Sequence, residues 1–182
     1  MNATTAKHPA SEVRVRSAGI EDAATLAAFG ARTFADAYRE LIPEDELERY
    51  VARSFSLDQI RAELGAPGST FIIAERGTEA VGYARLLAEP RPGVDAAAPA
   101  LRLVRIYVDH ALVRGGVGSL LMRACLEHAH AKGRPSLWLR VWEENRTAIA
   151  FYEKWRFVKV DTLEFDMLGE VRMDWIMQVG AA

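Results

Sequence analysis

Three glycines and an arginine lie between an apolar run and a helical pattern in the stretch HALVRGGVGSLL, residues 110–121. Gly116 and Gly118 fall at the start of the expected helix. The first backbone N–H groups of a helix have no partner inside it, and the helix dipole makes that end positive. This stretch therefore predicts a loop that holds a phosphate or pyrophosphate, and a plain turn with a helix cap is the alternative.

Residue types exclude two common phosphate loops at this position. A nucleoside-triphosphate loop needs lysine and then serine or threonine after its glycines, whereas Ser119 and two leucines follow Gly118. A dinucleotide fingerprint needs a third glycine where this chain has Leu121. A third class of phosphate loop is left.

The rest of the pattern supplies the elements that must position this loop. Apolar alternation or continuous apolar runs predict strands over residues 12–18, 69–76, 79–89, 101–109, 136–142, 156–165 and 170–179. Helical spacing predicts helices over 17–42, over 44–64, after the glycine loop, and around 148–155. Residues 90–100 are rich in proline, glycine and alanine and are expected to form a loop. This order describes a mixed sheet with helices on its faces.

Composition limits the class of protein. The 182 residues suit one compact domain, expected over 12–182 after a disordered segment 1–11. The formal net charge of −2 gives no positive field for nucleic acid, and no apolar run is long enough for a membrane span, so neither partner is expected. The lone Cys125 is expected to pack inside a helix, which fits a cytoplasmic location.

A second stretch turns these patterns into a family resemblance. Downstream of the glycine loop, a strand pattern is followed by Asn145, Ala148, Phe151, Tyr152 and Phe157. The two stretches together resemble the GNAT superfamily of acetyl-CoA-dependent N-acetyltransferases. Within it, residues 105–109, 141–157 and 166–177 resemble the branch of spermine and spermidine acetyltransferases. The resemblance implies an α/β fold with a mixed, mostly antiparallel sheet of about six or seven strands, helices on both faces, and two parallel neighbours that splay apart.

The resemblance also implies where acetyl-CoA binds. The cofactor would enter between residues 101–108 and 136–142, with its pantetheine arm on the backbone at Ile106, Tyr107 and Val108. The N–H near Val108 would stabilise the oxyanion. The pyrophosphate would lie on Val113, Arg114, Gly115, Gly116, Val117, Gly118 and Ser119, and the site would be completed by Asn145, Ala148 and Tyr152.

Two positions depart from the family pattern. Val113 stands where the family usually has glutamine or arginine, and the neighbouring Arg114 is expected to supply the charge. Arg156 stands where a glycine usually precedes the final Phe157. A cradle of backbone N–H groups survives the first change because it needs no side chain.

Acyl transfer from a thioester to an amine needs a neutral amine and a proton for the departing thiolate. A phenol with an ordinary pKa of about 10 keeps its proton at neutral pH, so Tyr152 is the expected acid, with simple packing as its alternative role. Residues 101–108 contain no carboxylate, so the proton acceptor is expected elsewhere. Glu40 is taken as this base, and Asp36 and Glu143 are alternatives.

Acidic residues near the expected acceptor side favour a cationic acceptor. They are Glu40, Glu44, Asp45, Glu46 and Glu48. A polyamine such as spermidine or spermine is therefore the leading substrate, and a solvated helix face is the alternative explanation. Acetylation of a protein N-terminus or another small amine, and a non-catalytic acetyl-CoA-binding module, are the alternative functions. The oligomeric state is open, with a homodimer as one option.

Two other groups are expected to be structural. His128 and His130 lie two residues apart in a helical pattern and point to different sides, so no metal is expected. Trp138 and Trp142 lie on one face of their strand and are expected to pack rather than to form a cation-binding cage.

Overall fold

A computed structural model describes residues 12–93, 100–134, 136–167 and 170–180. The segment 1–11, predicted to be disordered, and the middle of the predicted loop 90–100 lie outside these ranges. Within the described ranges, no helix has the length and apolar character that crossing a membrane requires.

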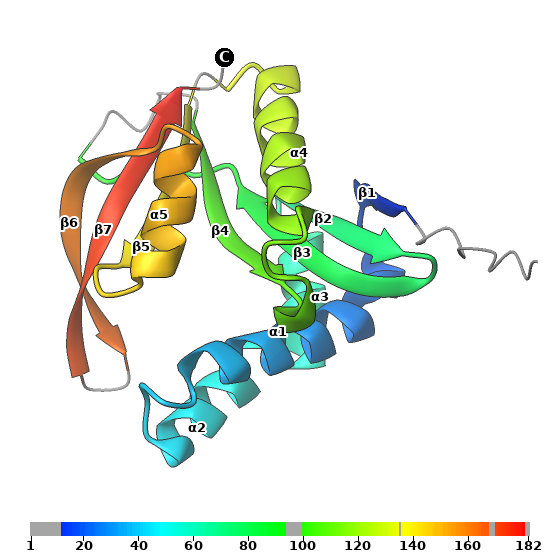
Figure 1. Cartoon of the computed structure of the whole chain (residues 1–182), viewed down its shortest axis with the longest axis horizontal. Helices are drawn as coiled ribbons and strands as arrows, with labels where there is room; N and C mark the ends of the chain where they lie inside the picture. Colours follow the sequence, from blue (N-terminus) through cyan, green and yellow to red (C-terminus); the bar gives the residue numbers. More distant parts are fainter. Residues whose placement is uncertain (1–11, 94–99, 135, 168–169, 181–182) are drawn as a thin grey trace, which may run out of the picture.

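Seven strands form one sheet in the order β1-β2-β3-β4-β5-β7-β6 (Figure 1). The strands are β1 (Val13–Ser17), β2 (Ser69–Arg76), β3 (Glu79–Leu87), β4 (Ala100–Val108), β5 (Ser136–Trp142), β6 (Val158–Met167) and β7 (Glu170–Gly180). The neighbours β4 and β5 are parallel, and the other five pairs are antiparallel. The expected mixed, mostly antiparallel sheet with one parallel pair is confirmed.

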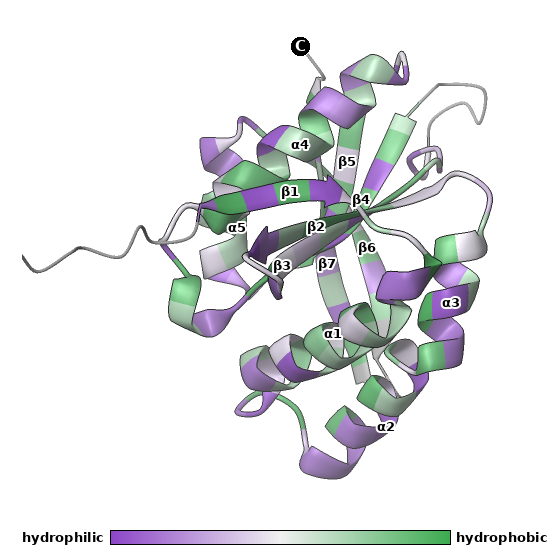
Figure 2. Cartoon of the chain, turned by 90° about the vertical axis from the view of Figure 1, so that its right-hand side faces the viewer, coloured by the Kyte–Doolittle hydropathy of each residue, from purple (hydrophilic) through white to green (hydrophobic). Residues whose placement is uncertain are grey.

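Five helices cover the two faces of the sheet. They are α1 (Ala23–Tyr38), α2 (Glu44–Ser54), α3 (Leu57–Gly65), α4 (Val117–Ala131) and α5 (Arg146–Lys154), and two short turns of 3-10 helix are η1 (Ile20–Asp22) and η2 (His110–Leu112). Figure 2 shows the sheet between α4 with α5 on one side and the group α1 to α3 on the other. We call these sides the α4 face and the α1 face.

The predicted helix 44–64 is wrong as one helix, because the chain breaks it at Phe55 and Ser56. The Ser56 hydroxyl accepts the N–H of Gln59 at 3.2 Å and caps a new helix, α3. Phe55 is buried between the two helices at 4% exposure. The serine followed by a helical pattern was the sequence signal for this cap.

Two apolar clusters hold the helices to the sheet. On the α4 face, Leu121, Met122 and Cys125 of α4 pack with buried residues of the central strands. On the α1 face, Phe29 and Phe34 of α1 pack with residues of α2, α3, β2 and β3. The central strands are thus covered on both sides, which explains why β4 is apolar on both of its faces.

Candidate active site

The parallel neighbours β4 and β5 pair along only part of their length. Their register runs from Ala100 opposite Ser136 to Leu103 opposite Leu139 and then stops. Figure 1 shows the two strands together near the top of the sheet and apart below. We call the unpaired residues 104–108 and 140–142 the splay. It is the separation that was expected for these two strands.

A β-bulge lies where this pairing ends. Arg105 of β4 is opposite Arg85 of β3. The next pair is Leu103 with Leu86, which leaves Val104 as an extra residue. A bulge bends its strand and increases the local twist. The bend at Val104 therefore accounts for the separation of β4 from β5.

Hydrogen bonds between β3 and β4 decide which backbone groups of β4 face the splay. Asp109, directly after the strand, donates its N–H to the Val81 carbonyl at 3.0 Å. Backbone groups of successive residues in an antiparallel pair point to alternate sides, so those of Tyr107 also face β3. Ile106 and Val108 therefore direct their N–H and C=O groups into the splay.

The opposite side of the splay is a second unpaired edge. Glu143 donates its N–H to the Met173 carbonyl of β7 at 3.0 Å. By the same alternation, the backbone groups of Arg140 and Trp142 face β4. A ligand with amide groups along an extended chain can pair with such edges as an added strand does.

The glycine loop follows η2 and leads into α4. Arg114 and Gly116 have left-handed backbone, with φ of 70° and 88°. Gly116 is the N-cap of α4 and has no side chain that could satisfy the first helical N–H groups. Four N–H groups find no backbone acceptor in the described part of the chain, those of Gly116, Val117, Gly118 and Ser119. The loop therefore offers a row of donors to an anion.

The space around the glycines leaves room for a ligand. A Cβ added at Gly116 would meet nothing within 4 Å. A Cβ added at Gly118 would lie 3.5 Å from the Phe151 ring of α5 and 3.7 Å from Val108. Gly118 therefore borders the space between α4, α5 and the open edge of β4, and a larger side chain there would fill it.

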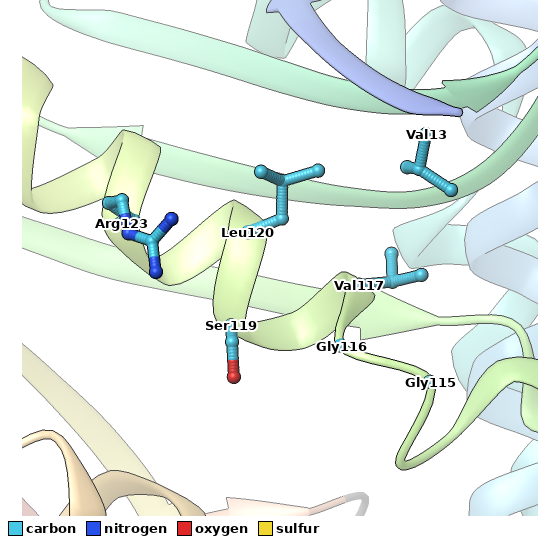
Figure 3. A pocket seen from close by; sticks show the side chains of 7 residues that line it. All are labelled: Val13, Gly115, Gly116, Val117, Ser119, Leu120 and Arg123. Carbon is cyan, nitrogen blue, oxygen red and sulfur yellow. The ribbon is translucent and has the colours of Figure 1, made fainter.

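The side chains in the first turn of α4 point to different sides of the helix. Figure 3 shows Val117 and Leu120 directed toward Val13 of β1, at a hollow of about 460 Å³, while Ser119 points away from them. Val113, the position of the family departure, is 51% exposed. Its valine side chain offers no hydrogen bond, so an anion at this loop would have only backbone groups and nearby charges as partners.

Asn145 joins the start of α5 to the α1 face. Its Oδ1 accepts the N–H of Ala148 at 3.1 Å and caps the helix. Its side chain also lies close enough to the Tyr38 phenol of α1 to affect the pKa of that group. Burial raises the pKa of the Tyr38 phenol, and this contact lowers it in part. The predicted capping role is therefore confirmed, with a contact that sequence reasoning missed.

Tyr152 lies on α5 within an aromatic group. Its ring centroid is 5.6 Å from that of Phe151 and 5.7 Å from that of Phe157. Burial raises the pKa of its phenol above the ordinary value, and the nearby Tyr38 and Cys125 raise it further. No hydrogen bond to another described residue occupies the hydroxyl. A protonated phenol with a free hydroxyl can donate a proton.

An aspartate that sequence reasoning missed lies on the other side of the splay. Asp174 of β7 is directly opposite Trp142 of β5. Its carboxylate binds Arg140 at 2.9 Å. Burial raises the pKa of Asp174, whereas Arg140 lowers it in part. Asp174 also raises the pKa of Tyr38, so these two groups are close enough to interact.

Aromatic rings adjoin this carboxylate. The centroids of Tyr38 and Trp142 are 6.5 Å apart, and the Arg172 guanidinium lies 4.8 Å from the Trp142 centroid. Tyr38 stacks on Phe34 at 4.5 Å. Residues from α1, β5 and β7 thus meet on the α1 face, beside the open ends of β4 and β5. Trp142 does stack with a cation, which the expectation of packing alone did not include.

The three expected proton acceptors lie in different surroundings. Glu40 is exposed in the turn after α1, and its carboxylate makes no hydrogen bond or ion pair with a described residue. Asp36 is exposed and pairs with Arg39 at 3.4 Å. Glu143 is half-buried at the end of β5. The acids of α2 are mostly exposed, but Oε2 of Glu46 is buried with no hydrogen-bond partner in the described part of the chain.

Two expectations about structural residues are confirmed. Cys125 is fully buried in the α4-face cluster, and burial raises the pKa of its thiol to about 12. Trp138 is buried, its ring N–H donates to the Glu89 carbonyl at 2.9 Å, and, as at Trp142, a guanidinium, that of Arg102, lies over the ring at 5.1 Å. In the described ranges, no three histidine, cysteine or acidic side chains gather as a metal ion would require.

Comparisons with known proteins agree with this geometry. Residues 33–157 match the model of the acetyltransferase (GNAT) family. An uncharacterised N-acetyltransferase of Lactobacillus delbrueckii subsp. lactis is 25% identical over 140 residues, covering 77% of this chain and 81% of the relative. An uncharacterised N-acetyltransferase of Mycobacterium tuberculosis is 27% identical, covering 86% of this chain and 96% of the relative.

A solved structure has the same fold. PaiA N-acetyltransferase from Thermoplasma acidophilum, in complex with coenzyme A, superposes with a TM-score of 0.76 at 20% identity, covering 93% of this chain and 99% of that chain. The family match spans the glycine loop, the splay and Tyr152. This chain belongs to the acetyltransferase (GNAT) family and is an acetyl-CoA-dependent N-acetyltransferase.

Proposed function

We propose that the protein transfers the acetyl group of acetyl-CoA directly to a primary amine, and that this amine is a polyamine such as spermidine or spermine. The observation that carries the transfer is the unpaired edge of β4 beside the glycine loop. No covalent enzyme intermediate is needed, because the amine can attack a thioester held in the splay from the α1 face.

Backbone groups hold the cosubstrate in this proposal. The free N–H groups from Gly116 to Ser119 bind the pyrophosphate at the positive end of α4. Ile106 and Val108 pair with the pantetheine arm, and the Val108 N–H donates to the thioester oxygen as it becomes an oxyanion. The exposed Arg114 adds charge beside the loop. The coenzyme A bound to the related PaiA supports this assignment.

Tyr152 is proposed as the acid that protonates the departing thiolate. Two observations support this role: its phenol has a raised pKa, and no described residue occupies its hydroxyl. A free thiol has a pKa of about 8.5 and an ordinary phenol a pKa of about 10, so proton transfer from the phenol to the thiolate is uphill. The phenolate is restored by a proton from solvent, which balances the proton that the amine releases. Packing against Phe151 and Phe157 would hold the ring in place.

Asp174 is the proton acceptor that the surroundings favour, and Glu40 is the alternative from the sequence. Asp174 is largely buried, has a raised pKa, and interacts with Tyr38 next to the splay. Glu40 is exposed at the end of α1. An alkylammonium with a pKa of about 10.4 is almost fully charged at neutral pH, so a carboxylate that accepts its proton raises the reactive fraction.

Charge on the α1 face supports a polyamine as the acceptor. The buried Oε2 of Glu46 has no partner in the described chain and would be satisfied by an ammonium group. Exposed carboxylates of α2, such as Glu44 and Glu48, would draw a polycation to the same side. A protein N-terminus or another small amine is the alternative acceptor, because the cosubstrate site serves any amine.

A panel of amines tests this proposal. Thiol release from acetyl-CoA is measured with spermidine, spermine, single amino acids, aminoglycosides and short peptides. We expect the highest kcat/KM with a polyamine. Faster turnover of a peptide would move the assignment to a protein N-terminus. Binding of acetyl-CoA without transfer to any amine would identify a non-catalytic module.

A further inference from the structure

A buried cluster of charges lies between α3 and the sheet, on the α1 face. Glu63 of α3 is 6% exposed and contacts two arginines. Its Oε1 lies 2.9 Å from Nη1 of Arg85, and it accepts a bond of 3.1 Å from Nη2 of Arg105. Its other oxygen, Oε2, accepts a bond from Nη1 of Arg105. Guanidinium groups stay charged in proteins, so the cluster has one negative and two positive charges.

The two arginines face each other across neighbouring strands. Arg85 of β3 and Arg105 of β4 are directly opposite in the antiparallel register. Like charges at directly opposite positions destabilise a strand pair. Glu63 reaches both from a helix packed over the sheet, so its carboxylate offsets a repulsion that the two strands cannot avoid by themselves.

The Arg85–Arg105 pair lies where the splay begins. The register between β3 and β4 shifts immediately beyond Arg85 and Arg105, at the bulge of Val104. The pairing of β4 with β5 also ends there, at Leu103. The next residue after Arg105 is Ile106, whose backbone groups face the splay. Any movement of Arg105 is therefore passed along the backbone to the open edge.

Arg105 is also tied to the junction between α2 and α3. Its guanidinium lies 5.0 Å from the centroid of the Phe55 ring. Its Nη2 donates to the Ser54 carbonyl at 3.4 Å. Phe55 is the buried residue at the break between the two helices. One side chain therefore connects the helices of the α1 face with the unpaired segment of β4.

We propose that Glu63 is a positioning residue for acetyl transfer, acting through Arg105. By offsetting the repulsion between Arg85 and Arg105, it fixes the bend at Val104 and the direction of the Ile106 and Val108 N–H groups. This inference rests on the proposed role of that edge in holding the thioester. A purely structural role would lower the stability of the fold without changing the geometry of the edge.

The variant Glu63→Gln tests the proposal, because it keeps the size of the side chain and removes its charge. We expect kcat to fall about tenfold, since a misplaced oxyanion donor slows the chemical step. The Kd of coenzyme A should rise by a smaller factor than kcat falls, because the glycine loop proposed to hold the pyrophosphate is untouched. The matched control is Ile60→Val, a fully buried change in the same helix that should lower Tm and leave kcat unchanged.

A second variant separates charge from folding. Glu63→Gln with Arg85→Met removes one positive charge and so relieves the repulsion that Glu63→Gln leaves behind. We expect this double variant to recover most of the lost kcat. If Glu63 only supports the fold, the double variant should have a lower kcat than the single one, because it loses more contacts.

The NMR chemical shifts of the Ile106 and Val108 backbone amides test the geometry of this edge without any catalysed reaction. In Glu63→Gln without any substrate these resonances should move, while those of α4 stay in place. Moved resonances in a protein that acetylates no amine would refute the proposed function and leave the positioning role intact. Unmoved resonances with an unchanged kcat, or a double variant no better than the single one, would refute the positioning role.

Discussion

The two faces of the sheet offer a ligand polar groups of different kinds. On the α4 face, the donors are backbone N–H groups of one continuous segment, from Ile106 to Ser119. On the α1 face, the polar groups are side chains from separate elements, Tyr38 of α1, Asp174 of β7 and Glu46 of α2. The first kind of site depends on backbone geometry, and the second depends on residue identity.

This difference has a consequence for how each site changes with sequence. Val113 can replace a polar residue in the glycine loop because the free N–H groups belong to the backbone. The α1 face should tolerate substitution less well, because replacing Asp174 or Glu46 changes the charge beside the splay. Substitutions that act on one face should therefore leave binding at the other face nearly unchanged.

The largest expected effect concerns Tyr152, which packs against the α4-face cluster and interacts with Tyr38 of the α1 face. Tyr152→Phe should lower kcat about 100-fold, because it removes the proposed acid. The Kd of acetyl-CoA should stay within about twofold, since the ring and its packing remain. Steady-state kinetics and calorimetry measure the two quantities. A kcat equal to that of the wild type would remove Tyr152 from the reaction.

The pH profile sharpens the same assignment. Burial raises the pKa of the Tyr152 phenol, so it stays protonated where an ordinary phenol, with a pKa of about 10, would ionise. The wild-type kcat should therefore hold as pH rises through 10, over the range where the protein stays folded by circular dichroism. A tenfold fall in kcat per pH unit just above 10 would indicate an unperturbed acid.

The next effect tests backbone recognition on the α4 face. Gly118→Val should weaken acetyl-CoA binding by about 2 kcal/mol, or about 30-fold in Kd, because the side chain enters the space beside Phe151 and Val108. Val113→Ala is the matched control in the same loop and should leave Kd nearly unchanged. A strong effect at Val113 would mean that side chains, rather than N–H groups, hold the phosphates.

A smaller effect is expected from the carboxylate on the α1 face. Asp174→Asn should lower kcat/KM for the amine about tenfold near pH 7 and leave the Kd of acetyl-CoA unchanged. The deficit should shrink as pH approaches the pKa of the amine, about 10.4, because the amine then loses its proton to solvent. Glu40→Gln is the control. If Glu40→Gln shows the deficit and Asp174→Asn does not, the base is Glu40.

The smallest effect concerns the affinity for a polycation. Glu46→Gln should raise the KM for spermidine about threefold, the size expected for one partly exposed ion pair. The exposed neighbour Glu48→Gln should change it less. Equal, small effects at both positions would indicate that α2 attracts the substrate through its overall charge and has no specific contact.

The sequence predicted the α4 face well because its features are local. The glycines, the helix after them and the cap at Asn145 each depend on a few neighbouring residues, and the structure has all three. The Val104 bulge was not predicted, since it exists only relative to the register of β3. The break at Ser56 was missed because the apolar spacing continues through it, although the serine cap was visible.

The α1 face could not be assembled from the sequence alone. Asp174 comes beside Trp142 because β7 inserts between β5 and β6, an order that neighbouring residues do not encode. Glu63 and Arg105 are 42 positions apart and meet only after α3 packs on the sheet. The role of these residues depends on long-range contacts. In the sequence, they cannot be distinguished from ordinary surface charges.

Hydrogen exchange at single amides of β4 tests the central claim most directly. In the free protein, the N–H groups of Ile106 and Val108 should exchange rapidly, whereas that of Tyr107, bonded to β3, should exchange slowly. Saturating coenzyme A should slow exchange at Ile106 and Val108 and at Gly118 in the loop. Binding of coenzyme A with no protection of Ile106 and Val108 would contradict the account, because the ligand would then lie outside the splay.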